Sequence, residues 1–376
     1  MNIALLGHGT VGRGVDGIIR ARVPEIEVTR ILELPDRITD PRMTSDFGEI
    51  LADNSVELVV ECMGGIEPAH TFIAAALAAG KHVVTSNKAV VAAHFAEFAR
   101  LSEEHGVAFL IEASVGGGIP WIASIDKVRR IDEVNSFMGI MNGTTNYIMD
   151  SMRREGLDFD IALGRAQELG YAERDPSADI DGIDVANKTI ISACVAFDVD
   201  CIRELPVTGI RTVTKRDLDL FSSHGLMVKL FGRGVCKDGR YAVAVEPVAI
   251  PMMSLEAAVP SNFNLVSLEG VTIGPLKFYG QGAGSLPTGN AIVQDVIDVS
   301  HGRRQRYDFS RGLVYDPSLM VCDYVLRSTV CPPHADAWAP GAWRVRNLTA
   351  EAARKLLEDV WQKDPTAFMA ALRQEV

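Results

Sequence analysis

Carboxylates crowd one short stretch of the chain, and a single lysine closes it. Within residues 170–188, the five acidic residues that precede Lys188 are Glu173, Asp175, Asp179, Asp181 and Asp184. Asp184 and Lys188 are four residues apart, so a helix over 182–197 would place them on one face. The rest of that segment is apolar, and a charged side chain on a mostly buried helix is destabilising unless it is paired or used in chemistry.

Two interpretations fit this pattern. Taken alone, Asp184 and Lys188 favour a surface ion pair that stabilises a helix by about 0.2–0.5 kcal/mol. The density of acids in a loop that contains Pro176 favours the alternative, in which carboxylates bind a substrate ammonium group. Lys188 would then exchange a proton with a reacting oxygen.

Glycines near the start of the chain form a second candidate site. Gly7, Gly9 and Gly12 fit the pattern G-x-G-x-x-G between a strand-like run, 2–6, and a helix-like run, 11–22. In that context the first glycine permits a tight turn, the second lets the backbone approach a pyrophosphate, and the third allows close packing of helix and strand. The helix N-terminus supplies N–H groups for phosphates, so we predict a dinucleotide site.

Residues that follow the neighbouring strands extend this site. Glu33 closes the second strand-like run, at the place where an acid usually bonds the ribose hydroxyls. A 2′-phosphate would be repelled there, so we expect NAD to be preferred over NADP, although Arg37 and Arg42 stand nearby and either would bind a phosphate. Gly64 follows the strand 56–60 and would let the backbone approach a flat ring, but a simple turn explains it equally well.

The elements that must position these residues follow an alternating order. Up to about residue 130, short apolar strands alternate with amphipathic helices, which indicates an α/β fold with a parallel sheet of the Rossmann type. The strand-like and helix-like runs are 2–6, 11–22, 28–32, 56–60, 68–79, 82–85, 89–105 and 107–111. Parallel strands that are buried on both faces have nearly continuous apolar sequences, and the predicted strands have such sequences.

The pattern changes beyond residue 130 to that of an α+β domain. The expected elements are a strand at 134–141, helices near 144–154, 158–169 and 182–197, mostly strands over 208–280 with a pair at 227–236 and 241–250, and helices at 289–299, 349–361 and 365–373. We predict a dinucleotide-binding domain over 1–130 to which 286–302 returns, a catalytic and dimerisation domain over 131–285, and a small C-terminal segment over 303–376.

The bulk composition argues against several classes of function. The chain has 376 residues and a formal net charge of −12, which disfavours nucleic acids and anionic membranes because both select clustered lysine and arginine. No apolar run reaches the ~20 residues that span a bilayer, and no signal-like segment opens the chain, so we expect a cytoplasmic protein. Six cysteines are scattered along it, and Cys331 and His334 have no second pair of ligands nearby. We therefore expect reduced thiols, and no zinc site at Cys331 and His334.

Four segments resemble the diagnostic segments of homoserine dehydrogenase, and they occur in that family's order. They are 86–88, 112–120, 139–148 and the acidic run 170–188. The resemblance covers about residues 1–302. It implies an NAD(P)-dependent oxidoreductase that interconverts L-homoserine and L-aspartate 4-semialdehyde by hydride transfer, in threonine and methionine biosynthesis.

The resemblance also implies roles for the matching residues. Lys188 would give a proton to the aldehyde oxygen or take one from the homoserine hydroxyl, while Glu173 and Asp184 would bind homoserine beside Asp179. Lys88 would lie near both cofactor and substrate. Further cofactor contacts would come from Thr10, Val11, Gly170, Gly282 and Gly284.

The segment 112–120 resembles the family's monovalent cation site. The ligands of a sodium ion would be Glu112, Val115, Gly117 and Ile119, largely through backbone carbonyls. A glycine-rich loop that only shapes a domain junction is the alternative. We also expect a homodimer, whereas residues 303–376 carry no clear pattern of the regulatory ACT domain that ends many family members.

Two other functions stay open on the sequence alone. An aspartate-semialdehyde dehydrogenase would need a thiolate nucleophile, for which Cys62 at a strand end is the candidate. The second alternative is a regulator that binds NAD without turnover. An assay of cofactor reduction in the presence of L-homoserine would distinguish these two functions from homoserine dehydrogenase.

Overall fold

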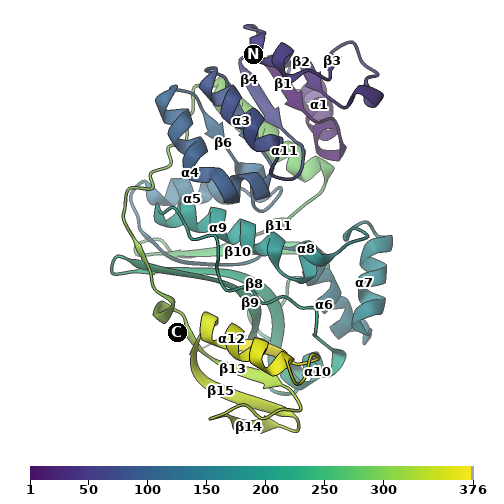
Figure 1. Ribbon diagram of the computed structural model, residues 1–376, viewed down its shortest axis with the longest axis vertical. Coiled ribbons are helices and arrows are strands. Elements are labelled where there is room, and N and C mark those ends of the chain that lie inside the picture. The colour runs from purple at the N-terminus through teal and green to yellow at the C-terminus, as the bar shows by residue number, and fades with distance from the viewer. Residues whose placement is uncertain (374–376) are drawn as a thin grey trace. The chain divides into compact units, whose positions relative to one another are not determined.

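The computed structural model describes residues 1–373, which divide into two compact units (Figure 1). Unit 1 comprises Met1–Arg130, Cys194–Arg203 and Gln281–Arg311. Unit 2 comprises Ile131–Ala193, Glu204–Gly280 and the residues from Gly312 onward. The described part of the segment 303–376 is thus shared between both units.

Unit 1 is built on a parallel sheet with the strand order β3-β2-β1-β4-β5-β6. Its strands are β1 (Asn2–Leu6), β2 (Glu27–Leu32), β3 (Met43–Thr44), β4 (Leu58–Glu61), β5 (His82–Thr85) and β6 (Phe109–Leu110). Its helices are α1 (Thr10–Arg22), α2 (Phe47–Ala52), α3 (Ala69–Ala78), α4 (Lys88–Glu104), α5 (Trp121–Arg129) and α11 (Ser285–Ser300). The strand order reverses between β1 and β4, and ligands of such open sheets bind beyond the carboxyl ends of the strands at that point.

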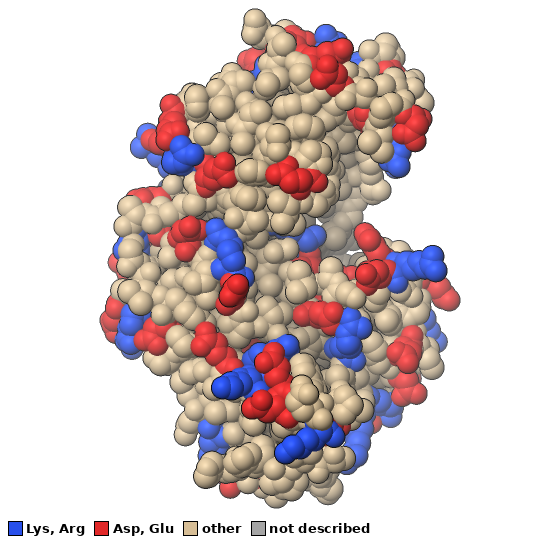
Figure 2. Space-filling view, in the orientation of Figure 1, with Lys and Arg blue, Asp and Glu red and all other residues tan. Residues whose placement is uncertain are grey.

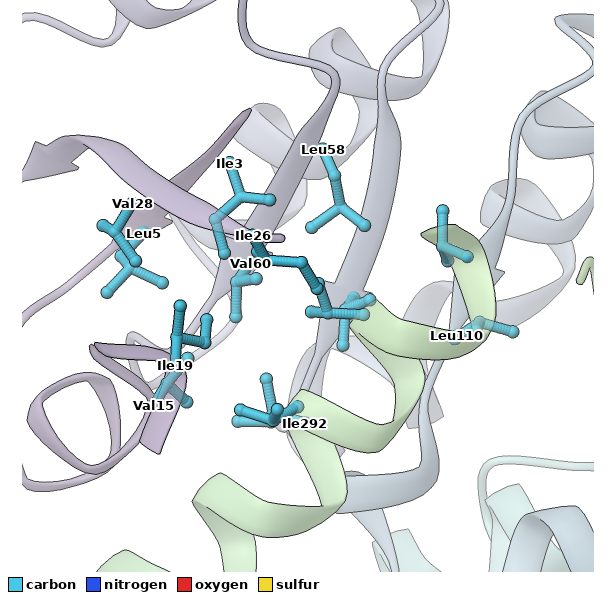
Figure 3. Packing of buried hydrophobic residues seen from close by; sticks show 14 of the residues in the cluster. Ile3, Leu5, Val15, Ile19, Ile26, Val28, Leu58, Val60, Leu110 and Ile292 are labelled. Atoms are coloured by element: carbon cyan, nitrogen blue, oxygen red, sulfur yellow. The ribbon is translucent and has the colours of Figure 1, made fainter. Parts of the chain in front are cut away.

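The core of unit 1 explains why its strands are unbroken apolar runs. Side chains of the sheet, such as the fully buried Leu58, pack with Val15 of α1 and Ile292 of α11 (Figure 3). Helix α11 also approaches α1 closely, because a Cβ atom at Gly14 would lie only 2.7 Å from the carbonyl oxygen of Ser285. A helix that is distant in sequence therefore completes the core around β1 and β4.

Unit 2 is built on a mostly antiparallel sheet with the order β11-β10-β7-β8-β9-β16-β13-β15-β14, and β12 pairs with β9. Its strands are β7 (Val134–Ile140), β8 (Leu226–Lys237), β9 (Arg240–Pro251), β10 (Phe263–Gly270), β11 (Gly274–Gln281), β12 (Val314–Tyr315), β13 (Val321–Arg327), β14 (Asp336–Ala339), β15 (Ala342–Thr349) and β16 (Phe368–Leu372). Its helices are α6 (Gly143–Glu155), α7 (Phe159–Glu168), α8 (Ser177–Ile180), α9 (Ile183–Phe197), α10 (Lys215–Ser223) and α12 (Ala350–Trp361). The last turn of α9 belongs to unit 1.

Two predicted elements of unit 2 are wrong. Residues 365–373 do not form a helix, because Phe368–Leu372 is strand β16 and pairs with both β9 and β13. Alanine, methionine and leucine favour helix locally, but four of the five side chains of β16 are buried in the sheet, and packing outweighs that preference. The strand-rich prediction for 208–280 also misses helix α10, which Thr214 and Asp217 begin with a reciprocal capping box.

Charged residues of both signs are interspersed on the face shown in Figure 2. Oppositely charged residues also pair within single helices, as Arg100 does with Glu104 in α4 and Arg354 with Glu358 in α12. Exposed pairs contribute at most about 1 kcal/mol each, so the stability of the units rests mainly on their buried cores. Across residues 1–373, the helices are all too short or too polar to cross a membrane.

Candidate active site

The glycine-rich loop between β1 and α1 leaves room for a ligand beside free N–H groups. Gly7 has a φ of +95°, which favours glycine, and its N–H donates to the carbonyl of Leu32 at 3.0 Å. A Cβ atom at Gly12 would lie 2.2 Å from the carbonyl oxygen of Gly7, whereas a Cβ atom at Gly9 would meet nothing within 4 Å. No side chain caps α1 at Gly9, so the first N–H groups of the helix are available to an anion.

Glu33 lies beside this loop, directly after β2. Its carboxylate accepts hydrogen bonds from the N–H groups of His8 at 2.8 Å and Leu34 at 3.0 Å. Burial opposes ionisation of Glu33, but these two N–H groups, together with the charges of Arg37 and His8, lower its pKa. An ionised carboxylate is therefore fixed against the glycine loop.

The two arginines near Glu33 differ in how firmly they are held. Arg42 donates to both carboxylate oxygens of Asp16, at 3.0 and 2.9 Å, and to Asp40 at 3.0 and 2.8 Å. Arg37 is exposed, and its charge helps to lower the pKa of Glu33. Of the two, Arg37 is therefore the one that a phosphate could recruit at little cost.

A buried acid that sequence reasoning missed ends β4. Glu61 is fully buried. It accepts hydrogen bonds from the hydroxyl of Thr85 at 2.5 Å and from the backbone N–H of Met63 at 2.7 Å. Burial raises the pKa of Glu61, and these hydrogen bonds act against that rise. Asn87, two residues after the end of β5, donates to the carbonyl of Gly65 at 2.7 Å. This network fixes the loop that carries Gly64. The sequence signal for Glu61 was an acidic residue at the end of an apolar strand.

Lys188 on α9 is almost completely buried, with 8% of its surface exposed, and Asp184 is 6% exposed. The ammonium group of Lys188 donates to Oδ2 of Asp184 at 2.8 Å and to the backbone carbonyl of Met141 at 2.6 Å. A buried charge needs such partners, because removing one partner of a buried pair costs about 3–5 kcal/mol. Lys188 is therefore held in one position beside the junction of β7 and α6.

Asn142 connects this pair to a second carboxylate, and sequence reasoning gave it no role. Its amide nitrogen donates to Asp184 at 2.9 Å and to Asp179 at 2.6 Å, while its amide oxygen accepts from the N–H of Thr145 and caps α6. Burial raises the pKa of Asp179, the hydrogen bond from Asn142 lowers it in part, and the charge of Asp184 raises it further. An asparagine directly before a helix was the signal for the cap, but not for the bridge.

The other predicted residues of the acidic segment lie differently. Glu173 is exposed, and its backbone carbonyl accepts the hydrogen bond from Gln167 at 3.0 Å. Gly170 follows α7 with a φ of +74°. The structure thus gathers Asp179, Asp184 and Lys188 around Asn142 and leaves Glu173 on the outer part of the loop.

The remaining predicted cofactor residues of unit 1 lie at helix starts or in glycine loops. Thr10 and Val11 open α1, and Lys88 opens α4. Gly284 precedes α11 with a φ of +123°. Gly282 packs against the loop 112–120, because a Cβ atom at Gly117 would lie 2.5 Å from the carbonyl carbon of Gly282.

Glu112, the acid of that loop, uses its carboxylate to hold α5. Its two oxygens accept from the N–H groups of Ile122 at 3.0 Å and Ala123 at 2.7 Å. Burial raises the pKa of Glu112 to about 7 against the effect of these N–H groups. The backbone N–H of Glu112 donates to the buried carboxyl of Asp295 on α11 at 2.9 Å, so this acid ties two helices of unit 1 together.

Known proteins resemble both units. The family model for the NAD binding domain of homoserine dehydrogenase matches residues 7–112, and the homoserine dehydrogenase model matches 120–297. The homoserine dehydrogenase of a Synechocystis species is 41% identical over 316 residues, which are 80% of this chain and 73% of that protein. The Lactococcus lactis enzyme is 36% identical over 317 residues, covering 80% and 74%.

Solved structures agree with the sequence relatives. The homoserine dehydrogenase of Thiobacillus denitrificans superposes with a TM-score of 0.88 at 29% identity, over 100% of this chain and 98% of that chain. A hyperthermophilic archaeal homoserine dehydrogenase in complex with NADPH gives a TM-score of 0.69 at 25% identity, over 81% and 99%. These likenesses confirm the predicted fold class and the resemblance predicted from the motifs, and the chain belongs to the homoserine dehydrogenase family, as an oxidoreductase that uses a nicotinamide cofactor.

Proposed function

We propose that the chain interconverts L-homoserine and L-aspartate 4-semialdehyde, with Lys188 as the residue that moves the proton. The observation that carries this assignment is the buried ammonium group that Asp184 and Met141 hold at 2.8 and 2.6 Å. A proton donor positioned in this way contributes about 10²–10⁴-fold to turnover.

The same oxygen of the substrate gains or loses one proton in the two directions. When the alcohol is oxidised, Lys188 as a neutral amine accepts the hydroxyl proton, and when the aldehyde is reduced, the ammonium form returns a proton to that oxygen. Asp184 stabilises the ammonium form, and Asn142 keeps Asp184 in place through its hydrogen bond at 2.9 Å. When bound, the nicotinamide ring supplies the acceptor or donor of the hydride.

Carboxylates of the same segment support binding of the substrate's ammonium group. Asp179 lies within hydrogen-bond distance of Asn142 and so belongs to the network of Lys188. Glu173 lies six residues earlier on the exposed part of the loop, and we assign it the solvent side of the ammonium site. Removing Glu173 should therefore weaken homoserine binding more than cofactor binding.

The cofactor residues of unit 1 fit a dinucleotide. The open space at Gly9 and the uncapped start of α1 accept a pyrophosphate, and Glu33 accepts hydrogen bonds from ribose hydroxyls. We propose the nicotinamide side for Gly64, Lys88, Gly282 and Gly284, and backbone contacts to the dinucleotide for Thr10 and Val11. Gly170, which belongs to unit 2, is also proposed to contact the nicotinamide.

We further propose that NAD is preferred over NADP. The ionised Glu33 repels a 2′-phosphate, and Arg42 is committed to Asp16 and Asp40, so only Arg37 of these two arginines opposes the preference. Glu33→Ser should move the ratio of the catalytic efficiencies for the two cofactors toward NADP by about tenfold or more. A wild type that prefers NADP, with an unchanged ratio in the variant, contradicts the proposal.

A monovalent cation, sodium, would bind the loop 112–120 through backbone carbonyls. The Glu112 carboxylate is engaged by the N–H groups of α5, so its carbonyl is the group left for the ion, together with those of Val115, Gly117 and Ile119. The carbonyls of Glu112 and Ile119 already accept one backbone hydrogen bond each, at 3.4 and 2.8 Å, and a carbonyl oxygen has a second lone pair to offer. Exchange of sodium for lithium in an activity assay tests this role.

Reduction of NAD and NADP in the presence of L-homoserine tests the proposed function as a whole. Turnover that depends on L-homoserine supports it, and binding of the cofactor without turnover would favour a regulator. The semialdehyde-dehydrogenase alternative needs a reactive thiolate, but burial and the neighbouring Glu61 raise the pKa of Cys62.

We also propose a homodimer, which light scattering of the purified chain tests.

A further inference from the structure

Two histidines and a glutamate meet where α3 packs beside α4 in unit 1. His70 lies on α3, and His94 and Glu97 lie on α4. One potential ligand atom from each side chain lies within 4.8 Å of the other two. The side chains are 24%, 31% and 39% exposed, so an ion can reach them from solvent. None of these residues takes part in the proposed reaction.

The separations between these atoms suit a tetrahedral metal ion. Oε2 of Glu97 lies 2.9 Å from Nε2 of His70 and 3.5 Å from Nδ1 of His94. Bonds of about 2.0–2.1 Å at tetrahedral angles place two ligand atoms about 3.3 Å apart. These two separations lie on either side of this value. The rings of His70 and His94 are stacked with their planes inclined by 26°, so one ring would have to turn out of the stack for both lone pairs to point at the ion, and the partial exposure of the side chains leaves room for that turn.

The second ring nitrogen of His70 has the partner that metal-bound histidines usually have. Its Nδ1 lies 3.0 Å from Oε1 of Glu67, whose other oxygen accepts from the hydroxyl of Thr71 at 2.9 Å. A carboxylate at one ring nitrogen holds the proton there and turns the lone pair of the other nitrogen outward. Nε2 of His70 and Oε2 of Glu97 share a hydrogen bond of 2.9 Å, and a metal ion would take the place of the proton between them.

The local backbone and packing bring the two rings together. Helix α4 departs from helical geometry at His94, which has φ −128° and ψ 19°. The ring of His94 stacks on His70 with centroids 3.9 Å apart. The buried ring of Phe98 lies 5.7 and 6.1 Å from the two imidazoles. This apolar wall shields one side of the group from water, which strengthens charge interactions within it.

We propose that His70, His94 and Glu97 bind one divalent transition-metal ion of the zinc type and so link α3 to α4. Two imidazoles and one carboxylate are ligands that zinc accepts, with a water molecule in the fourth position, whereas magnesium and calcium select oxygen ligands alone. The ion fixes α3, which follows the loop of Gly64, and α4, which begins with the predicted cofactor residue Lys88. Its expected effect is on the stability of unit 1.

Calorimetric titration of the chelator-treated full chain with zinc sulphate tests this site. The wild type should bind one ion per chain, and His94→Ala and Glu97→Gln should each weaken zinc binding by at least about tenfold. His105→Ala is the matched control, because His105 is exposed at the end of the same helix. It should bind zinc as the wild type does.

Thermal unfolding gives a second readout that does not depend on activity. Zinc should raise the Tm of the wild type and of His105→Ala, but not of His94→Ala, and magnesium chloride should raise none of them. Equal zinc affinity in the wild type and in both ligand variants overturns the proposal. A loss of affinity in His105→Ala as large as in His94→Ala also overturns it, because zinc would then bind surface histidines without selection.

Discussion

The two units present chemical groups in opposite ways. Unit 1 offers its backbone: Gly9 leaves space beside uncapped N–H groups, and the nearby carboxylates of Glu33 and Glu61 are themselves held by N–H groups. Unit 2 offers side chains, because Lys188, Asp184 and Asn142 hold one another in a buried network.

This difference predicts that the two sites fail in different ways. A site made of backbone and empty space is damaged when atoms are added, since the added atoms occupy the space of the ligand or of the packed chain. A buried network of charged side chains is damaged when atoms are removed, since an unpaired charge or polar group remains. Variants of each unit can break or sharpen the comparison.

The largest effect is expected from removal of the amine in unit 2. Lys188→Ala should lower turnover by about 10²–10⁴-fold, because the proton donor and acceptor is lost. Cofactor affinity, measured by fluorescence titration, should stay close to that of the wild type, since the glycine loop lies in unit 1. Turnover within a factor of a few of the wild type would exclude the assigned role of Lys188.

The next effect is expected from addition of one methyl group in unit 1. Gly12→Ala places a Cβ atom 2.2 Å from the carbonyl oxygen of Gly7, so it should weaken cofactor binding at least tenfold and cost about 1–3 kcal/mol of stability. Gly17→Ala is the matched control on the same helix, where a Cβ atom meets nothing within 4 Å. It should raise stability by up to about 1 kcal/mol. Equal cofactor affinity in both variants would refute the steric argument.

A smaller effect is expected when the amide bridge of unit 2 is removed but its cap is kept. Asn142→Ser retains a side chain that can cap α6 and loses the two hydrogen bonds to Asp179 and Asp184. Turnover should fall about tenfold, and the pH profile should shift, because hydrogen bonds to charged groups are worth about 1.5–3 kcal/mol. Asn142→Ala should lose the cap as well and unfold at a lower temperature than Asn142→Ser. An unchanged pH profile in Asn142→Ser would show that the bridge is structural.

The smallest effect on activity is expected at Asp295, which shapes the pH dependence of stability. Burial, with the charge of Glu112, raises the pKa of Asp295 well above its ordinary value. The folded state then holds more protons than the unfolded state above about pH 4, so stability falls as the pH rises from there toward the folded pKa. The amide of Asp295→Asn can still accept the hydrogen bond from the N–H of Glu112, but it does not titrate and so binds no extra proton in the folded state. Its free energy of unfolding should fall less steeply with pH, and parallel curves would contradict this account.

The sequence predicted most of unit 1, because its signals are local. The pattern of Gly7, Gly9 and Gly12 lies within residues 7–12, and the apolar runs coincide with strands of the sheet. The bridge from Asn142 to Asp184 spans 42 residues, and neither periodicity nor spacing reports such a contact. The group of His70 and His94 was missed for the same reason.

Strand β16 was missed for a different reason. Its residues favour a helix in isolation, and only pairing with β9 and β13 makes them a strand. Propensity is a weak preference that burial in a sheet overrides. Sequence reasoning therefore failed where the structure of a segment depends on partners that are distant in the chain.

The place of β16 in the sheet has a consequence for protein synthesis. Domains generally fold as the chain leaves the ribosome, at about 5–20 residues per second. Val248 and Ala249 of β9 pair with Ala371 and Leu372, so the nascent chain carries an open strand edge with buried apolar residues until Leu372 has emerged. Such an edge promotes aggregation. Yield of the native protein in cells should therefore respond to translation rate and to chaperones that shield this edge.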